Sequence, residues 1–397
     1  MIFLQYGAGN IGRSFIGALF ARAGYEVVFV DVNPVVLEAL NRDRRYKVEI
    51  HDHPPSEFWV EGVRAVDGRD VEAVAREIAA ADLMGTAVGP NILPRIFPVI
   101  ARGLIQRLGQ GRPPLDIIIA ENLRHASAVL SAGLQENLPP DFPLESYVGL
   151  VETSIGKMVP IMPEEIVHRD PTLVYAEAYN TLILDKKGFR NKIPSVPGLA
   201  PKENMEAYVD RKLFVHNLGH AAGAYLGYRK SPEKQFIWEI MEDTGLREKV
   251  QGAMRESAQA LLRRYPGEFT PEDLEEHIAD LLRRFSNRAL GDTIFRIGRD
   301  LPRKLSREDR LIGALLLDDA MLVEAPLTVQ AAAAAFAFQA TDEGGRLFPA
   351  DAAFHETLAA KGLDYVLKEV CGLNPGIPAE ARISEAIRQA YEQLPTA

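Results

Sequence analysis

The glycine-rich segment at residues 7–12 is the strongest constraint on how this chain can fold. It reads Gly-Ala-Gly-Asn-Ile-Gly and follows the apolar run Ile2–Tyr6, which predicts a buried strand. A helical pattern, Arg13–Ala23, begins directly after it. A strand, a Gly-x-Gly-x-x-Gly turn and a helix in this order are typical of the start of a dinucleotide-binding unit.

Each glycine of this segment has an expected role in holding a pyrophosphate. Gly7 permits the tight turn, Gly9 lets the pyrophosphate approach the backbone, and Gly12 lets the helix pack closely on the strand. The amides at the start of the helix donate hydrogen bonds, and their dipole favours an anion. We therefore expect the cofactor to contact the whole segment, that is Gly7, Ala8, Gly9, Asn10, Ile11 and Gly12.

The second predicted strand, Val27–Asp31, ends in an acid about 20 residues after Gly12, where an acid selects the cofactor. A carboxylate at this position binds the ribose hydroxyls of NAD and repels the 2′-phosphate of NADP, so NAD is the expected cofactor. The segment Thr86–Pro90 ends a later strand at the same sheet edge. We expect Thr86 and Val88 to line the cofactor site, although an ordinary turn is an alternative there.

The rest of the first half continues the alternation of strands and helices. Further strands are expected at 82–88, 115–120 and 147–152, and a short helix at 34–41. Strands separated by helices indicate a parallel, doubly wound sheet with helices on both faces. The fold class is therefore α/β, with a Rossmann-like NAD-binding domain at residues 1–195. The proline- and glycine-rich stretch Lys186–Asn204 reads as a connector.

Helical periodicity dominates the second half of the chain. The predicted helices cover about 203–228, 232–264, 271–287, 309–321, 326–341 and 378–392. We expect residues 196–397 to form a largely α-helical domain that carries the catalytic and substrate-binding groups. The active site is expected in the cleft between the two domains.

Bulk composition argues against several classes of protein. The formal net charge of the 397 residues is −10, which disfavours a nucleic-acid partner. The single cysteine, Cys371, excludes an internal disulfide and a cysteine zinc cage, and it fits a reducing cytoplasm. Neither a signal peptide nor an apolar run near the ~20 residues of a membrane span is evident. A cytoplasmic monomer or small homo-oligomer is expected.

A polar face in the predicted helix at 203–228 is the first candidate for chemistry. Lys212, His216, His220 and Asn217 fall within about 140° of one another on a helical wheel. A buried lysine loses its charge readily and can act as a base near neutral pH. An imidazole can orient it, and an amide can donate to a developing oxyanion. A solvated polar face is the alternative interpretation.

A second candidate is the densest positive patch in this acidic chain. It comprises Arg296, Arg299, Arg303 and Lys304. Clustered cations of this kind would hold an anionic substrate. A solvated helix end explains the pattern equally well.

Together these segments resemble the polyol-specific long-chain dehydrogenase/reductase family, over nearly the whole chain. The matching segments are Tyr6–Gly17, Asp31–Asn33, Thr86–Pro90, Glu121-Asn122, Arg211–Phe214 with Asn217 and Gly219-His220, Gly298-Arg299, Arg303–Ser306 and Asp309–Ile312. The Lys-x4-Asn-x2-His spacing is the most specific of these signals. The resemblance implies a Rossmann domain, a helical C-terminal domain and catalysis without a metal.

The resemblance also implies roles for individual residues. Lys212 would be the general base, Asn217 and Asn122 would form the oxyanion hole, and His220 would orient the substrate or the lysine. Arg296, Lys304 and Glu177 match substrate-contacting positions. Two departures stand out. His216 replaces an apolar residue, and Gly156–Pro160 replaces a segment with Asp-Arg, where Lys157 would keep the cation and contact the substrate.

The family members most similar to this chain imply NAD(H)-dependent interconversion of mannitol 1-phosphate and fructose 6-phosphate. The same chemistry on an unphosphorylated polyol or hexuronate, such as mannitol, fructuronate or tagaturonate, is the nearest alternative. A protein that binds NAD but has lost catalysis is a more distant one, against which the intact Lys212, Asn217 and His220 argue.

Overall fold

The first strand, β1 (Ile2–Tyr6), lies inside an eight-stranded sheet of order β11-β10-β8-β7-β6-β1-β2-β5. The sheet is parallel except where β10 runs antiparallel to β8. Its other strands are β2 (Glu26–Asp31), β5 (Val63–Asp67), β6 (Leu83–Thr86), β7 (Leu115–Ile119), β8 (Val148–Ser154), β10 (Leu182–Asp185) and β11 (Leu199–Lys202). All five strands expected from the sequence belong to this sheet, and the α/β fold class is confirmed.

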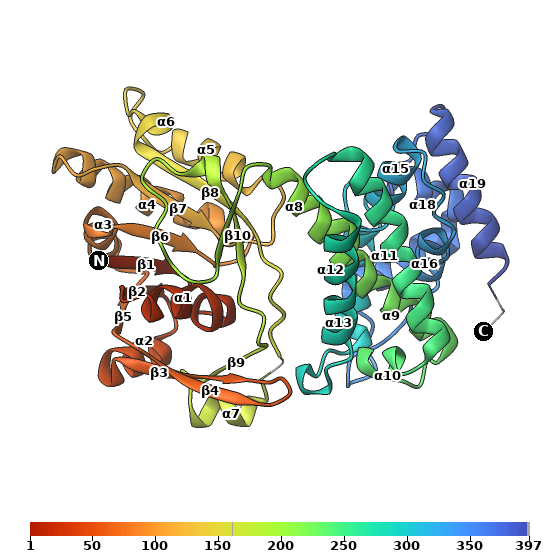
Figure 1. Cartoon of the computed structure of the whole chain (residues 1–397), viewed down its shortest axis with the longest axis horizontal. Helices are drawn as coiled ribbons and strands as arrows, with labels where there is room; N and C mark the ends of the chain where they lie inside the picture. The colour runs from red at the N-terminus through yellow and green to blue at the C-terminus, as the bar shows by residue number, and fades with distance from the viewer. Residues whose placement is uncertain (161, 395–397) are drawn as a thin grey trace. The chain divides into compact units, whose positions relative to one another are not determined.

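Helices cover both faces of the sheet because its strands are apolar on both sides. Phe3 of β1 packs in one core with α1 (Ala18–Arg22) and α2 (Pro34–Asp43), while Leu4 packs in a second core on the other face. Figure 1 shows the helices of that second face above the sheet. They are α3 (Val71–Ala80), α4 (Leu93–Gly109) and α5 (Ala126–Gln135). The doubly wound arrangement is confirmed.

Several parts of the first half differ from the sequence-based expectation, including the unexpected strands β5 and β10. A second sheet, of order β4-β3-β9, consists of β3 (Arg45–Ile50), β4 (Ser56–Glu61) and β9 (Val174–Ala176). The interpretation of 186–204 as a connector was wrong, because it contains the short helix η2 (Lys186–Gly188) and the strand β11. Pro201 is tolerated in β11 because this strand lies at the edge of the sheet.

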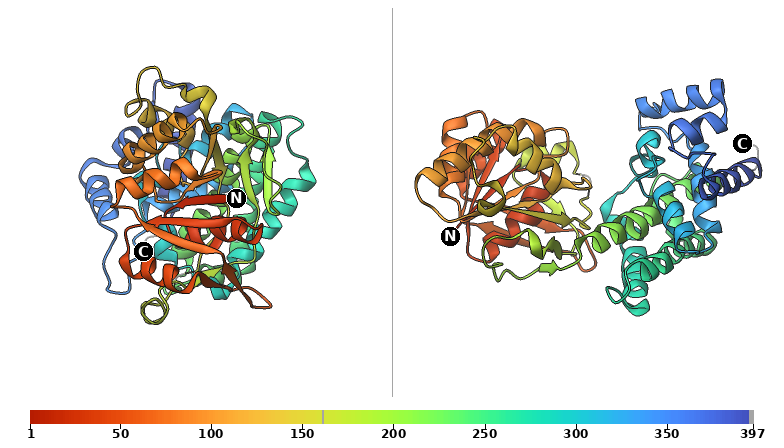
Figure 2. Two further views of the ribbon diagram at one scale, coloured as in Figure 1. Left: turned by 90° about the vertical axis from the view of Figure 1, so that its left-hand side faces the viewer. Right: turned by 90° about the horizontal axis from the view of Figure 1, so that it is seen from above.

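The second half is helical, as expected (Figures 1 and 2). The helix α9 (Leu218–Lys230) is almost entirely buried and contacts α10, α11, α13 and α16. The helices that follow it are α10 (Ile237–Met241), α11 (Thr244–Arg264), α12 (Pro271–Phe285), α13 (Ile294–Gly298), α14 (Leu301–Lys304), α15 (Ile312–Ala320), α16 (Pro326–Phe336), α17 (Pro349–Lys361), α18 (Leu363–Glu369) and α19 (Pro378–Glu392). The predicted helix 232–264 is in fact two helices, α10 and α11.

The computed structural model describes residues 1–160 and 162–394. By internal contacts the chain divides into two units, Met1–Val209 and Asp210–Ala397. The division falls inside α8 (Met205–Arg211), later in the chain than the expected boundary at 195/196, because β11 completes the first sheet. No helix in the described residues is both long and apolar enough to cross a lipid bilayer.

Candidate active site

The glycine segment forms a tight turn between β1 and the first helix. Gly7 has a φ of +95°, and a Cβ there would lie 2.4 Å from the Ala87 carbonyl oxygen, so only glycine fits. A Cβ on Gly12 would lie 2.0 Å from the carbonyl oxygen of Gly7. Gly9 is different, since it is exposed and a Cβ there would meet no atom within 4 Å. The loop thus leaves open backbone at the position expected to face a pyrophosphate.

Two charged side chains fasten this loop to its surroundings. Arg13 is buried, and its guanidinium donates to the carbonyl oxygens of Ala8 (2.6 Å) and Pro171 (2.9 Å). The Asp31 carboxylate at the end of β2 accepts from the Ala8 amide at 2.8 Å. Sequence reasoning missed the role of Arg13. Both contacts converge on Ala8, so the loop holds its shape and Asp31 lies beside it.

The second predicted cofactor loop is held by a buried carboxylate. The backbone amides of Val88 and Gly89 donate to the two oxygens of Glu121, at 2.9 and 2.7 Å. Thr86 is buried at the end of β6, and Asn122 is exposed in the loop between β7 and α5. The structure therefore places Thr86, Val88 and Asn122 after neighbouring parallel strands, at the sheet edge where ligands bind in such folds.

Two further residues of the first unit were expected near the substrate. Lys157 is buried, and its Nζ donates to the Tyr179 carbonyl oxygen at 2.7 Å and lies 5.1 Å from the centre of the Phe15 ring. Glu177 is also buried and accepts a hydrogen bond from the Met158 amide. Both side chains bind backbone groups of their own unit, and their contact with substrate stays a prediction.

In the second unit, the predicted catalytic residues Lys212 and Asn217 lie on a π-helical turn, and His220 lies on the helix that follows. The turn η3 spans Lys212–Asn217 and continues into α9. In a π turn the hydrogen bond runs from residue i to i+5, so Asn217 lies one turn above Lys212. On an α-helical wheel these two residues stand about 140° apart, at the two edges of the predicted polar face. Short π segments inside α-helices occur often at functional sites, and this one brings the expected base and amide onto one face.

The pKa of Lys212 is lowered to about 8. Burial is the main cause, the guanidinium of Arg310 adds to it, and the carboxylate of Asp309 opposes it. A substantial fraction of the amine is therefore neutral just above neutral pH, as a general base requires. The pKa of His216 is different. Its ring is buried against Phe285, and burial holds its pKa well below the usual range.

His220 is held by a carboxylate that sequence analysis did not single out. Its Nε2 lies 2.9 Å from Oδ2 of Asp292, and its ring stacks on Phe285 with 4.8 Å between ring centres. The other oxygen of Asp292 accepts from Nε of Arg296 at 2.8 Å. Asp292 therefore joins two expected site residues, His220 and Arg296, on different helices.

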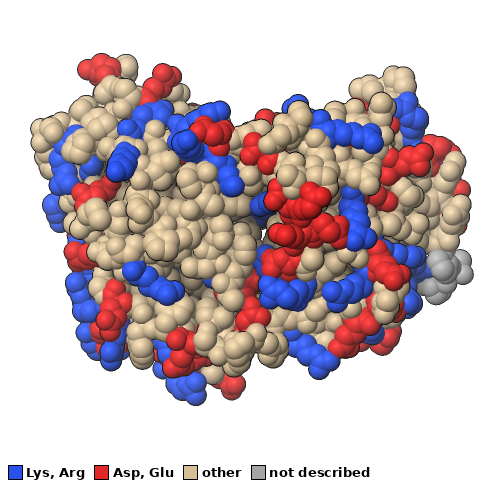
Figure 3. All heavy atoms as spheres, viewed as in Figure 1, with Lys and Arg blue, Asp and Glu red and all other residues tan. Residues whose placement is uncertain are grey.

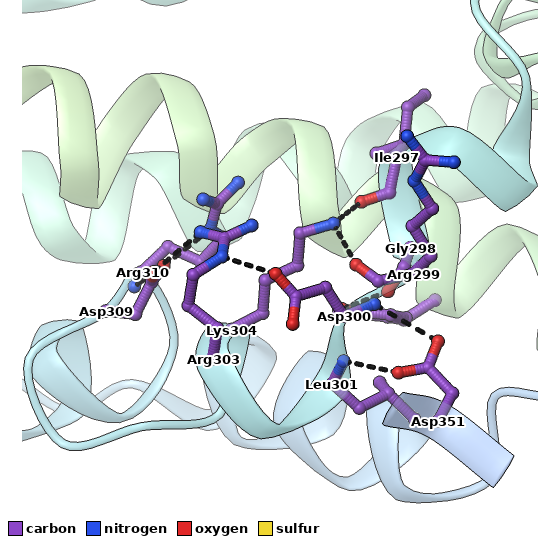
Figure 4. A network of polar contacts seen from close by, with 11 residues as sticks. Ile297, Gly298, Arg299, Asp300, Leu301, Arg303, Lys304, Asp309, Arg310 and Asp351 are labelled. Atoms are coloured by element: carbon purple, nitrogen blue, oxygen red, sulfur yellow. Dashed lines mark hydrogen bonds and ion pairs between the residues drawn. The ribbon is translucent and has the colours of Figure 1, made fainter. Parts of the chain in front are cut away.

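Residues of the predicted positive patch take part in a network of polar contacts (Figure 4). The amine of Lys304 is buried and donates to the carbonyl oxygens of Ile297 and Arg299. Burial lowers its pKa to about 7, with Arg310 and Arg303 acting in the same direction. In this structure the amine faces the end of α13, and its contact with substrate stays a prediction.

Arg310 is a residue that the sequence did not identify as part of the site. Its side chain is buried, its Nε donates to Oδ1 of Asp309 at 2.6 Å, and Arg303 donates to the other oxygen at 3.1 Å. The charge of Arg310 contributes to the lowered pKa of both Lys212 and Lys304. This buried guanidinium therefore links the two predicted groups of functional residues, the polar helix face and the positive patch.

Comparison with known proteins identifies the family to which this chain belongs. Residues 1–198 match the family described as mannitol dehydrogenase Rossmann domain, and residues 204–395 match the mannitol dehydrogenase C-terminal domain. The chain belongs to the mannitol dehydrogenase family. It is an NAD-dependent polyol dehydrogenase, so the expected enzyme class, cofactor and family are confirmed.

Individual relatives agree with the family assignment. The chain is 36% identical, over 394 residues and 99% of each chain, to a mannitol-1-phosphate 5-dehydrogenase of Brevibacillus brevis. Among solved structures, a D-sorbitol dehydrogenase in substrate-free form has a TM-score of 0.79, 15% identity and coverage of 98% of this chain and 92% of its own. Mannitol 2-dehydrogenase of Pseudomonas fluorescens, solved with NAD and D-mannitol, has a TM-score of 0.74, 18% identity and coverage of 99% and 91%. The two structures support the fold.

The role of Asp31 can be tested through cofactor preference. Asp31→Asn keeps an oxygen for the Ala8 amide but removes the negative charge. A like-charge repulsion near a protein surface is worth on the order of 1–4 kcal/mol, so the preference for NAD over NADP in kcat/KM should fall about tenfold or more. Steady-state kinetics with both cofactors measure this. Asp82→Asn, at the opposite end of β1, is the control, and an unchanged preference in Asp31→Asn would remove Asp31 from cofactor selection.

Proposed function

We propose that this polyol dehydrogenase interconverts mannitol 1-phosphate and fructose 6-phosphate, with Lys212 as general base. The observation that carries the proposed mechanism is the environment of Lys212. Its pKa is lowered to about 8, and Asn217 lies one π turn above it. The identity of the substrate is supported by the relative that is 36% identical and named mannitol-1-phosphate 5-dehydrogenase.

The residues of the first unit fit NAD. The exposed backbone at Gly9 leaves room for a pyrophosphate, and the Asp31 carboxylate stands beside the loop where the adenine ribose is bound in such folds. NAD, when bound, supplies the acceptor for the hydride that leaves the substrate carbon. All other steps of the proposed mechanism belong to side chains of this chain.

In the oxidation, neutral Lys212 accepts the proton of the C5 hydroxyl through Nζ. The side-chain amide of Asn217 donates to the oxygen as negative charge develops on it, and Asn122 is proposed to give a second donor. Loss of one proton to Lys212 and one hydride to the cofactor converts the alcohol to a ketone. In the reverse direction the Lys212 ammonium returns the proton to the oxygen. Independence from a metal remains part of the proposal.

The charge distribution of the second unit supports an anionic substrate. Figure 3 shows acidic and basic side chains interleaved on the visible face of this unit, in a chain of net charge −10. Attraction of an anion must therefore be local. Near the predicted base Lys212, the network of Figure 4 includes the guanidinium groups of Arg303 and Arg310, the amine of Lys304 and the carboxyl groups of Asp300, Asp309 and Asp351. The guanidinium groups stay charged, so a phosphate group would pair with them rather than with the amines of Lys212 and Lys304, whose pKa values are lowered.

A substrate panel tests the proposal. With NADH, kcat/KM for fructose 6-phosphate should exceed that for fructose, fructuronate and tagaturonate by orders of magnitude. Arg296→Ala should lower kcat/KM for fructose 6-phosphate about 10- to 100-fold, which is the contribution of a hydrogen bond to a charged group. The same substitution should lower kcat/KM for fructose less. Arg288→Ala, which breaks an ion pair with Glu242 in the same unit, is the matched control. A higher kcat/KM for fructose or a hexuronate than for fructose 6-phosphate would show that the proposed substrate is wrong.

The expected cellular setting remains a proposal as well. Cys371 is buried, and burial raises the pKa of its thiol to about 12, so the thiol stays protonated and unreactive. An inert cysteine and a negative net charge agree with a cytoplasmic enzyme that has no nucleic-acid partner. A monomer or small homo-oligomer is proposed, and size-exclusion chromatography with light scattering would determine the state.

A further inference from the structure

Asp292 contacts two residues of the predicted site and has no role in the mechanism above. Its side chain is only 3% exposed. Oδ2 lies 2.9 Å from Nε2 of His220 on α9, and Oδ1 accepts from Arg296 on α13, at 2.8 Å from Nε and 2.7 Å from Nη2. A buried carboxylate that contacts two functional side chains at once can fix the orientation of both.

The backbone around Asp292 is pinned by neighbouring segments. The Ile237 amide donates to the Asp292 carbonyl oxygen at 3.1 Å, and the Ile294 amide donates to Gln235 at 2.8 Å. Thr293, the next residue, caps the start of α13 by accepting from the Arg296 amide. The carboxylate therefore projects from a rigid corner, and its position does not depend on the ion pairs alone.

The contact with Asp292 determines which nitrogen of His220 carries the proton. Burial lowers the pKa of His220, although Asp292 opposes this effect, so the imidazole is neutral at neutral pH. Burial alone would raise the pKa of Asp292, but His220 and Arg296 hold it below the usual range, so the carboxylate is ionised. An ionised carboxylate only accepts hydrogen bonds. At 2.9 Å from this negatively charged oxygen a deprotonated Nε2 would be repelled, so the proton is favoured on Nε2 and Nδ1 keeps its lone pair.

We propose that Asp292 is a positioning residue that fixes His220 in the Nε2–H tautomer, so that Nδ1 can accept a hydrogen bond from a substrate hydroxyl, while it also anchors Arg296. The catalytic part rests on the proposed function; the tautomer does not. The stacking of His220 on Phe285, with 9° between the ring planes, restricts rotation of the imidazole beside Asp292. Asp292 thus orients both the acceptor Nδ1 of His220 on α9 and the guanidinium of Arg296 on α13.

Asp292→Asn separates this role from a purely structural one. Asparagine has the same shape but only one acceptor oxygen, so it cannot accept from both His220 and Arg296. Long-range ¹H–¹⁵N spectra of the full-length protein with ¹⁵N-labelled histidine report the tautomer, and His220→Gln assigns the signal. We expect pure Nε2–H in the wild type and a mixture or the Nδ1–H form in Asp292→Asn. The kcat should fall at least about 100-fold, with NADH binding retained.

Several outcomes would overturn the proposal. A wild-type His220 in the Nδ1–H form would do so whatever the substrate proves to be, which separates this inference from the proposed function. An unchanged tautomer and kcat in Asp292→Asn would also do so. Asp280→Asn, which breaks an ion pair with Arg284 on α12, is the control and should keep both. If Asp292→Asn does not fold, Arg296→Gln serves instead, because it leaves Asp292 beside His220 and must keep the Nε2–H form.

Discussion

Lys212→Ala should lower kcat by about 10²–10⁴-fold, the usual contribution of a positioned general base, while NADH still binds. The substitution removes the only group of η3 whose pKa, at about 8, is suited to accept a proton near neutral pH. Steady-state kinetics measure the loss, and fluorescence titration with NADH measures retained binding. Lys230→Ala is the matched control, because Lys230 ends the same helical stretch, is exposed and pairs with Asp243.

The pH profile gives a second measure of the same role. Oxidation requires the neutral amine, so kcat/KM for the polyol should rise with pH and level off above about 8. Reduction of the ketone requires the ammonium form and should decline above the same pH. Arg310→Gln removes a charge that lowers the pKa of Lys212, so both limbs should move to higher pH. Near-wild-type turnover in Lys212→Ala would show that another group takes the proton.

The sequence predicted the nucleotide-binding half well because its signals are local. A tight turn that only glycine can form and an acid after the next strand need no knowledge of distant contacts. The hairpin of β3 and β4 was missed although Arg45–Ile50 alternates between polar and apolar residues, which is the signal of a strand with one buried face. The missed strand β5 adds to the edge of the sheet beside β2.

The site was predicted in its residue types but not in its geometry. A helical wheel assumes a regular α-helix, so it could not show that the π turn brings Asn217 over Lys212 and leaves His216 buried. Asp292 contacts His220 and the charge of Arg310 acts on Lys212, and no local pattern marks these two interactions because the partners lie far apart in the sequence. Lys304 was expected to face a ligand, but its amine donates to the carbonyl oxygens of Ile297 and Arg299. This contact depends on where α13 ends, which the sequence pattern does not give.

Stability should respond to pH through a buried carboxyl group away from the site. Asp318 on α15 is fully buried and faces Glu256 and Ser257 of α11. Glu256 also accepts from the Thr328 amide and hydroxyl at the start of α16. Burial and then the charge of Glu256 raise the pKa of Asp318 to about 8. The folded protein therefore keeps a proton on Asp318 at neutral pH, whereas the unfolded chain releases it.

The sign of the pH dependence follows from this difference. Below about pH 4 the group is protonated in both states, and above about pH 8 it is ionised in both. Between these limits the folded state binds the extra proton, so the free energy of unfolding falls as pH rises, by up to about 1.4 kcal/mol per pH unit. Asp318→Asn removes this group, and its stability relative to wild type should increase steadily from pH 5 to pH 8.

Urea unfolding at pH 5, 6, 7 and 8 measures this trend through the transition midpoint. Asp319→Asn is the matched control, since the neighbouring Asp319 is partly exposed and pairs with Arg382. Loss of that pair should lower stability slightly and almost equally at each pH. Parallel curves for wild type and Asp318→Asn would mean that Asp318 is ionised in the folded protein across this range. A widening gap would show that the folded protein keeps the proton on Asp318, and that its ionisation beside the carboxylate of Glu256 lowers stability as pH rises.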